Sequence, residues 1–217
     1  MARKPLRVVH GRPLVLHVLE RAGAASCVSR VVLATDSEEV AAVGTAAGFE
    51  VAQTGPAHNG TERVALALAG LDGSPDVVVN VQGDQPALDP SHVDAAAALV
   101  LSGFEVATVC APLVGDPERP SRVKAVVGAD GRALYFSRAP VPHGGPYWLH
   151  LGVYAFTPRG LARCVAAPSD GLAASERLEQ LAWLEAGIAM GVARVARATP
   201  AVDEERDLVE VGATLRR

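Results

Sequence analysis

Short apolar runs alternate with amphipathic segments along the first hundred residues, and this alternation constrains the fold more than any other feature of the chain. Strands are predicted where the apolar runs are too short for helices, at 29–34, 49–53 and 76–81. Helices are predicted around them, at 12–25, 38–47, 61–69 and 91–101. This order is typical of an α/β fold with a mostly parallel sheet that helices cover on both faces.

The pattern changes after residue 104. Further strands are predicted, at 105–111, 122–127, 132–136 and 149–156. The turn sequence at 128–131 predicts that the second and third of these strands pair as a hairpin. The chain then continues with a helix at 172–186, a strand at 191–197 and a final helix from about Glu204. No linker or repeat interrupts the 217 residues, so we expect one domain, 1–217, with a β-rich subregion at 105–157.

Composition excludes several classes of protein. Hydrophobic residues make up 49% of the chain, and the formal net charge is only −4, which attracts neither nucleic acid nor an anionic membrane. No apolar run reaches the roughly 18 residues of a membrane helix. His17 and Glu20 interrupt the apolar start, which does not suit a signal peptide. We therefore expect a cytoplasmic protein without nucleic-acid or membrane partners.

The three cysteines, Cys27, Cys110 and Cys164, lie far apart in the sequence. Their spacing matches neither a zinc site nor a disulfide framework. We expect small buried thiols, as in a reducing cytosol.

The strand predicted at 76–81 leads into the polar sequence Gln82-Gly83-Asp84. Ligands of parallel sheets bind beyond the carboxyl ends of the strands, and Gly83 lets the backbone turn and a ligand approach. Asp84 therefore stands where a hard cation could be held against phosphate oxygens, as phosphoryl and nucleotidyl transfers require. Aspartate also commonly caps a turn, and spacing alone does not separate the two roles.

A second carboxylate, Asp203, precedes the last predicted helix. It could cap that helix, or it could pair with Asp84 around Mg²⁺. The chain contains no Walker lysine motif and no GxGxxG sequence, which argues against P-loop and dinucleotide-binding proteins.

The loop at 58–63 (HNGTER) is a third candidate. Gly60 and the first backbone N–H groups of the following helix could bind an anion or a base edge, and Arg63 could reach a nucleotide. The structural alternative is a helix capped by its threonine, with Glu62 and Arg63 in solvent.

Seven segments occur in an order that resembles one enzyme family: TDSEEV (35–40), HNGTERVA (58–65), VVVNVQGDQP (77–86), ALYFSRAPVP (133–142), HLGVYAF (150–156), LEQLAW (178–183) and AVDEERDL (201–208). With these segments the chain is similar to the 3-deoxy-manno-octulosonate (Kdo) cytidylyltransferases over nearly its whole length. That family activates Kdo, an acidic eight-carbon sugar, as its CMP derivative for lipopolysaccharide synthesis. The resemblance implies a Rossmann-like nucleotidyltransferase sheet, CTP and an acidic acceptor as substrates, and a homodimer formed through the hairpin region.

The resemblance also implies roles for individual residues. Asp84 and Asp203 would hold the catalytic Mg²⁺, and Lys4 would lie near the triphosphate. The cytidine nucleotide would contact His58, Gly60, Thr61, Arg63 and Gln82. The acceptor acid would contact Arg138, His150, Tyr154, Glu179 and Gln180.

The chemistry of the acceptor residues agrees with these roles. Arg138 can hold a carboxylate with two parallel hydrogen bonds, and Glu179 and Gln180 can bond sugar hydroxyls. His150 and Tyr154 are four residues apart and share one face of a predicted strand, which suits either acceptor binding or core packing.

The chain departs from the family at two places, and these leave alternatives open. Before its Gly-Lys-Pro-Leu segment the family has a hydrophobic strand and a phosphate loop, whereas here Met1 lies three residues before Lys4. We expect an upstream start or a shortened chain, and a CTP-binding protein without turnover is one alternative. On the acceptor side, Leu149 and Ala182 replace basic residues, and the loop before them is short. A small phosphonate acid is therefore an alternative acceptor, and a uridylyl- or other sugar-1-phosphate transferase is a further one.

Overall fold

The computed structural model describes residues 3–202 and 204–215, which form two compact units. The first unit combines the chain up to Gly73 with Asn80–Asp94 and the segment from Thr199 onward. The second unit combines Ser74–Val79 with Ala95–Ala198. None of the helices that the described residues form is long and apolar enough to cross a membrane.

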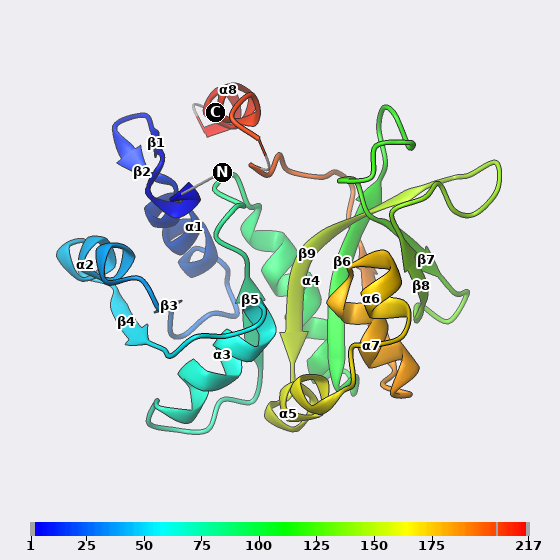
Figure 1. The fold of residues 1–217 in the computed structure, drawn as a ribbon, viewed down its shortest axis with the longest axis horizontal. Helices are drawn as coiled ribbons and strands as arrows, with labels where there is room; N and C mark the ends of the chain where they lie inside the picture. Colours follow the sequence, from blue (N-terminus) through cyan, green and yellow to red (C-terminus); the bar gives the residue numbers. More distant parts are fainter. Residues whose placement is uncertain (1–2, 203, 216–217) are drawn as a thin grey trace. The chain divides into compact units, whose positions relative to one another are not determined.

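In the first unit, helices surround a pair of parallel strands, β3 (Val32–Thr35) and β4 (Glu50–Gln53), as Figure 1 shows. The remaining elements of this unit are η1 (Lys4–Leu6), the antiparallel pair β1 (Val8–Val9) and β2 (Arg12–Pro13), α1 (Leu14–Gly23), α2 (Glu38–Ala46), α3 (Gly60–Ala69) and α8 (Asp207–Leu215). The apolar face of α1 packs with β3 and α2 through Val15, Leu19, Leu33 and Val40. This burial holds the helix against the strands, because apolar area removed from water is the main favourable term in folding.

A smaller cluster fixes the C-terminal segment within the first unit. Leu14, Val202 and Val211 are completely buried and pack together with Val9. His10 adds a hydrogen bond of 2.7 Å between its Nε2 and the Gly212 carbonyl oxygen. Val202 and α8 are therefore anchored beside the start of α1.

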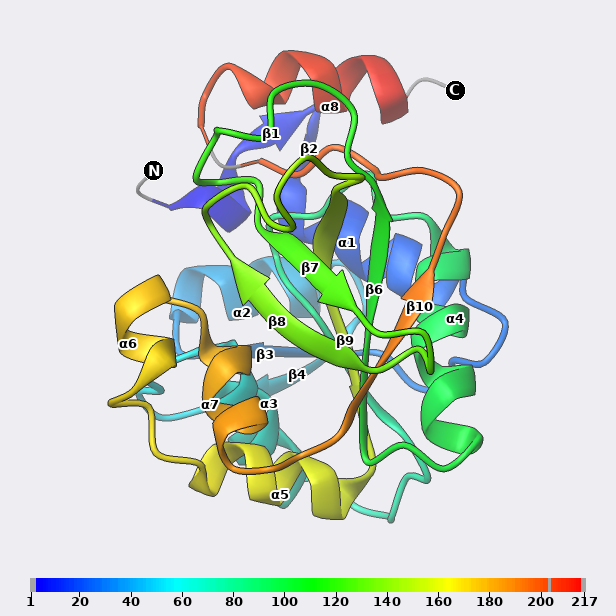
Figure 2. The same cartoon turned by 90° about the vertical axis from the view of Figure 1, so that its right-hand side faces the viewer.

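The second unit is built on a sheet in the order β10 (Met190–Arg194), β6 (Val106–Pro112), β9 (Trp148–Phe156), β7 (Lys124–Val127) and β8 (Ala133–Ser137). Strand β5 (Val78–Val81), which contributes residues to both units, pairs with β9 and completes six strands. The unit also contains α5 (Pro158–Ala166), α6 (Leu172–Glu176) and α7 (Glu179–Glu185), of which α7 packs against β8 (Figure 2). The helix α4 (Pro90–Leu101) contributes residues to both units.

The predicted α/β architecture, a sheet flanked by helices, is confirmed. Parallel pairing is found for β3 with β4 and for β10 with β6, whereas β9 pairs antiparallel with both β6 and β7. The predicted hairpin is present as β7 and β8, which are antiparallel because only a short turn joins them.

Two helix predictions need correction. The single helix expected at 172–186 is wrong, because Arg177 adopts a left-handed conformation with φ of 54° and ends α6. Leu178, which is 7% exposed, turns into the interior before α7 begins at Glu179. Helix α5 was not predicted, although Thr157 caps it through the Gly160 N–H and Pro158 occupies its first turn. Thr-Pro is a recognisable helix start, and Leu161 and Cys164 form a buried apolar face behind it.

Candidate functional site

Asp84 lies at the turn that follows β5, and two other parts of the first unit meet it. The Lys4 Nζ, from η1, donates to Asp84 Oδ2 at 3.2 Å, and both side chains are 24% exposed. The Val202 N–H donates to the Asp84 carbonyl oxygen at 2.8 Å. The turn itself is closed by the Gln85 N–H, which donates to the Gln82 carbonyl oxygen. The predicted site residue Asp203 lies outside the described residues.

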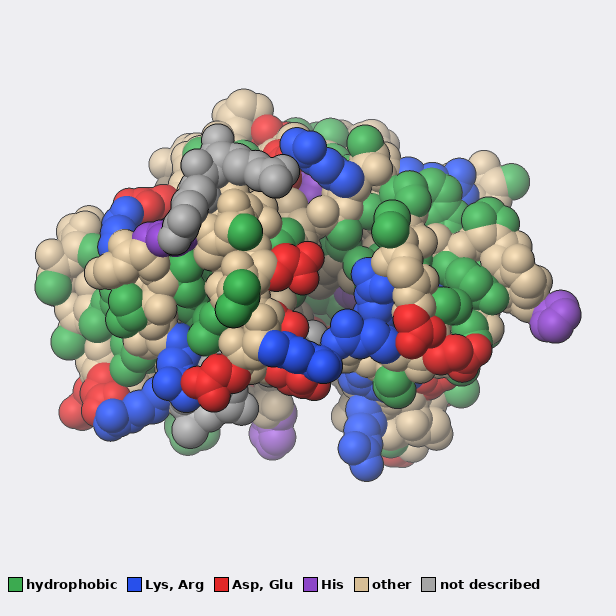
Figure 3. Space-filling model, turned by 90° about the horizontal axis from the view of Figure 1, so that it is seen from above, with side chains coloured by type: hydrophobic (Ala, Val, Ile, Leu, Met, Phe, Trp, Pro, Cys, Tyr) green, Lys and Arg blue, Asp and Glu red, His purple; other side chains and the backbone are tan. Residues whose placement is uncertain are grey.

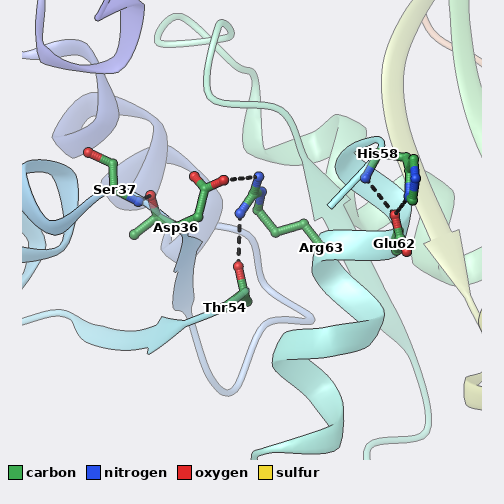
Figure 4. A network of polar contacts seen from close by, with 7 residues as sticks. Asp36, Ser37, Thr54, His58, Glu62 and Arg63 are labelled. Carbon is green, nitrogen blue, oxygen red and sulfur yellow. Dashed lines mark hydrogen bonds and ion pairs between the residues drawn. The ribbon is translucent and has the colours of Figure 1, made fainter. Parts of the chain in front are cut away.

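The loop before α3 is organised by hydrogen bonds within HNGTER. The side chain of Asn59 caps the helix by accepting from the Glu62 N–H at 2.8 Å, so the alternative of a threonine cap is wrong. Glu62 is not simply solvated either, because its carboxylate accepts from both the backbone N–H and the ring of His58 (Figure 4). These bonds, with the backbone bond the stronger influence, hold the pKa of Glu62 below its usual value.

Arg63 ties the start of α3 to the β3–β4 pair, as Figure 4 shows. One terminal nitrogen donates to Thr54 Oγ1 at 2.8 Å, and the other donates to Asp36 Oδ2 at 2.9 Å. The hydrogen bond from Arg63 lowers the pKa of Asp36. Arg63 thus holds three segments of the nucleotide-side candidate region in one arrangement.

Two buried polar atoms beside this loop lack hydrogen-bond partners among the described residues. They are Thr61 Oγ1 and Asn80 Nδ2, on residues that are 2% and 5% exposed. A Cβ added to Gly60 would lie 3.5 Å from Asn80 Nδ2, which is an ordinary van der Waals contact and shows that the start of α3 lies beside that amide. Because an unpaired buried polar atom is costly, this pair marks a place reserved for another hydrogen-bonding group. Sequence reasoning passed over Asn80, although a lone amide inside an apolar strand is a visible signal.

In the second unit, Arg138 is held by backbone acceptors. Its Nε and two terminal nitrogens donate to the carbonyl oxygens of Glu176, Pro120 and Arg177 at 2.8, 3.0 and 3.1 Å. The carboxylate of Glu176 accepts from the Arg138 backbone N–H and from the Ser137 hydroxyl. A guanidinium has five N–H donors, so two remain for a ligand after these three bonds.

Lys124 supports the same region from β7. It is completely buried, and its Nζ donates to the carbonyl oxygens of Pro117 and Arg138 at 3.0 and 2.5 Å. Burial lowers the pKa of Lys124, since the charged form loses hydration. Sequence reasoning missed this residue, although a charged side chain inside the strand predicted at 122–127 is a visible signal.

His150 and Tyr154 lie on β9 with neighbouring rings, as expected for two residues on one face of a strand, and they belong to an aromatic cluster. The ring of His150 is 5.0 Å from that of Phe136 and 5.3 Å from that of Tyr154, measured between centroids. Tyr154 in turn meets Trp183 at 5.1 Å. Burial lowers the pKa of His150 to about 4, and burial raises the pKa of Tyr154 well above its usual value, so both rings are neutral near pH 7.

Glu179 and Gln180 occupy the first turn of α7. The Gln180 side chain is only 2% exposed. Burial first, and then the charge of the nearby Glu179 carboxylate, raise the pKa values of Tyr154 and Cys164. The structure therefore brings Glu179 and Tyr154 near each other within the second unit.

The sequence profile of the cytidylyltransferase family matches residues 1–192. The chain belongs to this family. A Kdo cytidylyltransferase of Anaeromyxobacter sp. (strain Fw109-5) is 44% identical over 98% of this chain and 90% of its own length. A Kdo cytidylyltransferase of Rhodospirillum centenum is 45% identical over 98% of this chain and 87% of its own length.

A solved structure supports the same family membership. A CMP:2-keto-3-deoxy-manno-octonic acid synthetase, solved in complex with CTP, superposes with a TM-score of 0.92 at 32% identity. The match covers 100% of this chain and 92% of that chain. The predicted enzyme class, a nucleotidyltransferase, is therefore confirmed.

The cysteines and surface charges of this cytidylyltransferase add little to the site. Cys110 and Cys164 are buried as expected, but Cys27 is exposed, so the prediction of three buried thiols is wrong for Cys27. Partial desolvation, ahead of the nearby Asp94, still raises the Cys27 pKa to about 11, which keeps the thiol protonated. Acidic and basic side chains are interspersed on the face shown in Figure 3, in keeping with the small net charge of −4.

Proposed function

We propose that this cytidylyltransferase joins CMP from CTP to Kdo and releases pyrophosphate. The observation that carries the proposal is the meeting of Lys4, Asp84 and Val202, since it gathers a cation and a carboxylate from distant parts of the chain. The residue that follows Val202 in the sequence is the second predicted carboxylate, Asp203. The names of the relatives, which are Kdo cytidylyltransferases, support both substrates.

The donor set of this region suits Mg²⁺ in chemical type. The carboxylate oxygens of Asp84 are hard ligands, and the described residues contain no group of three metal-binding side chains, so further ligands would come from Asp203 and the substrate phosphates. Bound there, Mg²⁺ would neutralise negative charge on the phosphate oxygens. Lys4 forms an ion pair with the same carboxylate.

The chain's own residues contribute positioning and charge. A hydroxyl oxygen of the acceptor attacks the α-phosphorus of CTP, its proton passes to solvent, and the bond to pyrophosphate breaks on the opposite side. The Lys4 ammonium, 3.2 Å from Asp84, stabilises the negative charge that passes to the leaving group. Asp84 in turn orients Lys4, which limits the reorganisation needed in the transition state.

For the nucleotide, we assign contacts to Gly60, Thr61 and Gln82, with His58 and Arg63 bordering the same region. Support comes from the buried hydroxyl of Thr61, which has no hydrogen-bond partner among the described residues, and from the equally unpartnered Asn80 amide nitrogen beside Gly60. Arg63 supports this region through its hydrogen bonds to Thr54 and Asp36, because these bonds keep the start of α3 in place.

For the acceptor, we assign the carboxylate to Arg138 and the hydroxyl groups to His150, Tyr154, Glu179 and Gln180. Support comes from the two N–H groups that Arg138 has left after its three carbonyl bonds. A guanidinium that the protein already holds loses little conformational entropy when a carboxylate binds.

The proposal is tested by pyrophosphate release from CTP and Mg²⁺ with a panel of acceptors that includes Kdo and simple phosphonates. Asp84→Asn should remove most turnover and leave the urea midpoint nearly unchanged, whereas the exposed control Asp76→Asn should match the wild type. Near-normal turnover of Asp84→Asn would refute the assignment. Turnover with a phosphonate alone would replace Kdo as the acceptor. CTP binding without turnover for any acid would favour the binding protein.

We also propose a homodimer that forms through the β-rich region at 105–157, as the resemblance to the family implies. Size-exclusion chromatography with light scattering measures the mass directly. A mass equal to the 22.4 kDa of one chain would contradict the proposal.

A further inference from the structure

Thr108, in the middle of β6, is completely buried and makes two hydrogen bonds through one hydroxyl. Its Oγ1 lies 2.7 Å from the Val153 carbonyl oxygen and 2.9 Å from His150 Nε2. The pairing of β6 with β9 shifts register between Thr108 and Cys110. This irregularity lies beside His150, which is the pairing partner of Cys110.

The number of protons decides the direction of both bonds. A hydroxyl carries one hydrogen, and a carbonyl oxygen can only accept, so the Thr108 hydrogen must point to Val153. The second bond therefore runs from His150 Nε2–H to a lone pair of Thr108 Oγ1. His150 is thereby fixed with its proton on Nε2.

The surroundings of His150 leave Nδ1 as the remaining functional atom of the ring. The ring packs between Phe136 from β8 and Tyr154 from its own strand, and both of these neighbours are uncharged near pH 7. Burial lowers the pKa of His150 to about 4, so the imidazole is neutral and has a single N–H. Within the described part of the chain, Nδ1 has no hydrogen-bond partner.

We propose that Thr108 is a positioning residue for acceptor recognition, because it holds His150 in the tautomer whose Nδ1 accepts a hydrogen bond from a hydroxyl of the sugar acid. The inference rests on the proposed acceptor function. It also assigns different groups of the acceptor to two residues. An ionised carboxylate has no proton to donate to Nδ1, so His150 binds a hydroxyl and Arg138 binds the carboxylate. Discrimination follows, because an acceptor without that hydroxyl leaves the Nδ1 lone pair without a partner in the complex.

The first test reads the tautomer itself, in the full-length protein labelled with nitrogen-15 histidine. The His150 signal, assigned by its loss in His150→Gln, should show a protonated Nε2 and an unprotonated Nδ1 near neutral pH. Thr108→Ser should keep this signature, since it retains the hydroxyl. Thr108→Val should shift it toward a mixture of tautomers. A wild-type signal from Nδ1–H or from the doubly protonated ring would overturn the proposal.

The second test uses steady-state kinetics of the same variants. Thr108→Val should raise KM for the acceptor about tenfold, the equivalent of one lost hydrogen bond, and change KM for CTP less than twofold. Thr108→Ser should restore the acceptor KM. Equal increases in both KM values would indicate general damage and would also overturn the proposal.

The two tests keep this inference distinct from the function on which it rests. If wild-type protein does not turn over Kdo, the proposed acceptor is wrong, while the tautomer signature is still measured without substrate. If Thr108→Val does not fold, the wild-type signature and the Thr108→Ser kinetics still decide the result.

Discussion

Removing the buried hydroxyl of Thr61 should raise the free energy of unfolding of the nucleotide-free protein, and added CTP should cancel that gain. The Thr61 Oγ1 has no hydrogen-bond partner among the described residues, and the side chain is 2% exposed. A buried hydroxyl without a partner costs about 1–3 kcal/mol. Thr61→Val removes the hydroxyl, keeps the shape and has a similar helix propensity. We therefore expect its free energy of unfolding, without CTP, to exceed that of the wild type by about 1 kcal/mol.

Urea unfolding followed by circular dichroism measures this difference. With a slope of about 2 kcal/mol per molar urea, the midpoint of Thr61→Val should rise by about 0.5 M and the slope should stay the same. Thr35→Val is the matched control, because Thr35 is also buried, at 7% exposure, but its hydroxyl accepts from the Ser37 N–H. That control should lower the midpoint, since it removes a hydrogen bond instead of an unpaired group.

CTP should cancel the gain, because the proposed function uses the Thr61 hydroxyl for the nucleotide. At a concentration of 100 times Kd, CTP stabilises the wild type by about 2.7 kcal/mol. If the variant binds tenfold more weakly, the same concentration stabilises it by about 1.4 kcal/mol. The two proteins should then unfold at nearly the same urea concentration.

Two results would refute this reasoning. A lower midpoint for Thr61→Val without CTP would mean that the hydroxyl is bonded in the free protein. An equal gain from CTP in both proteins would mean that the hydroxyl does not serve the nucleotide.

Two further predictions concern stability. Gly160→Ala should lower the free energy of unfolding by about 2 kcal/mol despite its higher helix propensity, because the new Cβ would lie 2.2 Å from the Glu105 carbonyl oxygen. Gly70→Ala, which has no neighbour closer than 3.6 Å, should be neutral in the same urea titration, and equal effects would exclude the clash. The pKa of His150 is lowered from 6.5 to about 4, so the unfolded chain binds that proton first as pH falls. Stability should thus decrease from pH 6.5 to about 4, and His150→Gln should flatten that part of the titration; an unchanged profile would contradict the buried neutral ring.

Local sequence signals predicted most of the helices and strands, because the residues that cap a helix or set its apolar pattern lie next to one another in the chain. Ser37 caps α2 by accepting from the Val40 N–H, and Asn59 caps α3, so both helices begin where their own sequence directs. The break at Arg177 could not be predicted in this way. It follows from the burial of Leu178, which depends on what the rest of the second unit places around that side chain.

The sequence by itself was sufficient for the family and for the residue types of the candidate site, because ordered motifs such as NVQGDQP and HNGTER are local. The tertiary structure alone decided how these residues are used. Lys4 and Asp84 are 80 positions apart, yet their side chains form an ion pair, and Thr108 selects the tautomer of His150 from 42 positions away. Burial and the partners of each hydrogen bond are set only when distant segments pack together, because each segment removes the neighbouring segment from contact with water. The motif around Asp84 thus predicted where the chemistry lies, and the packing determined which side chains meet there.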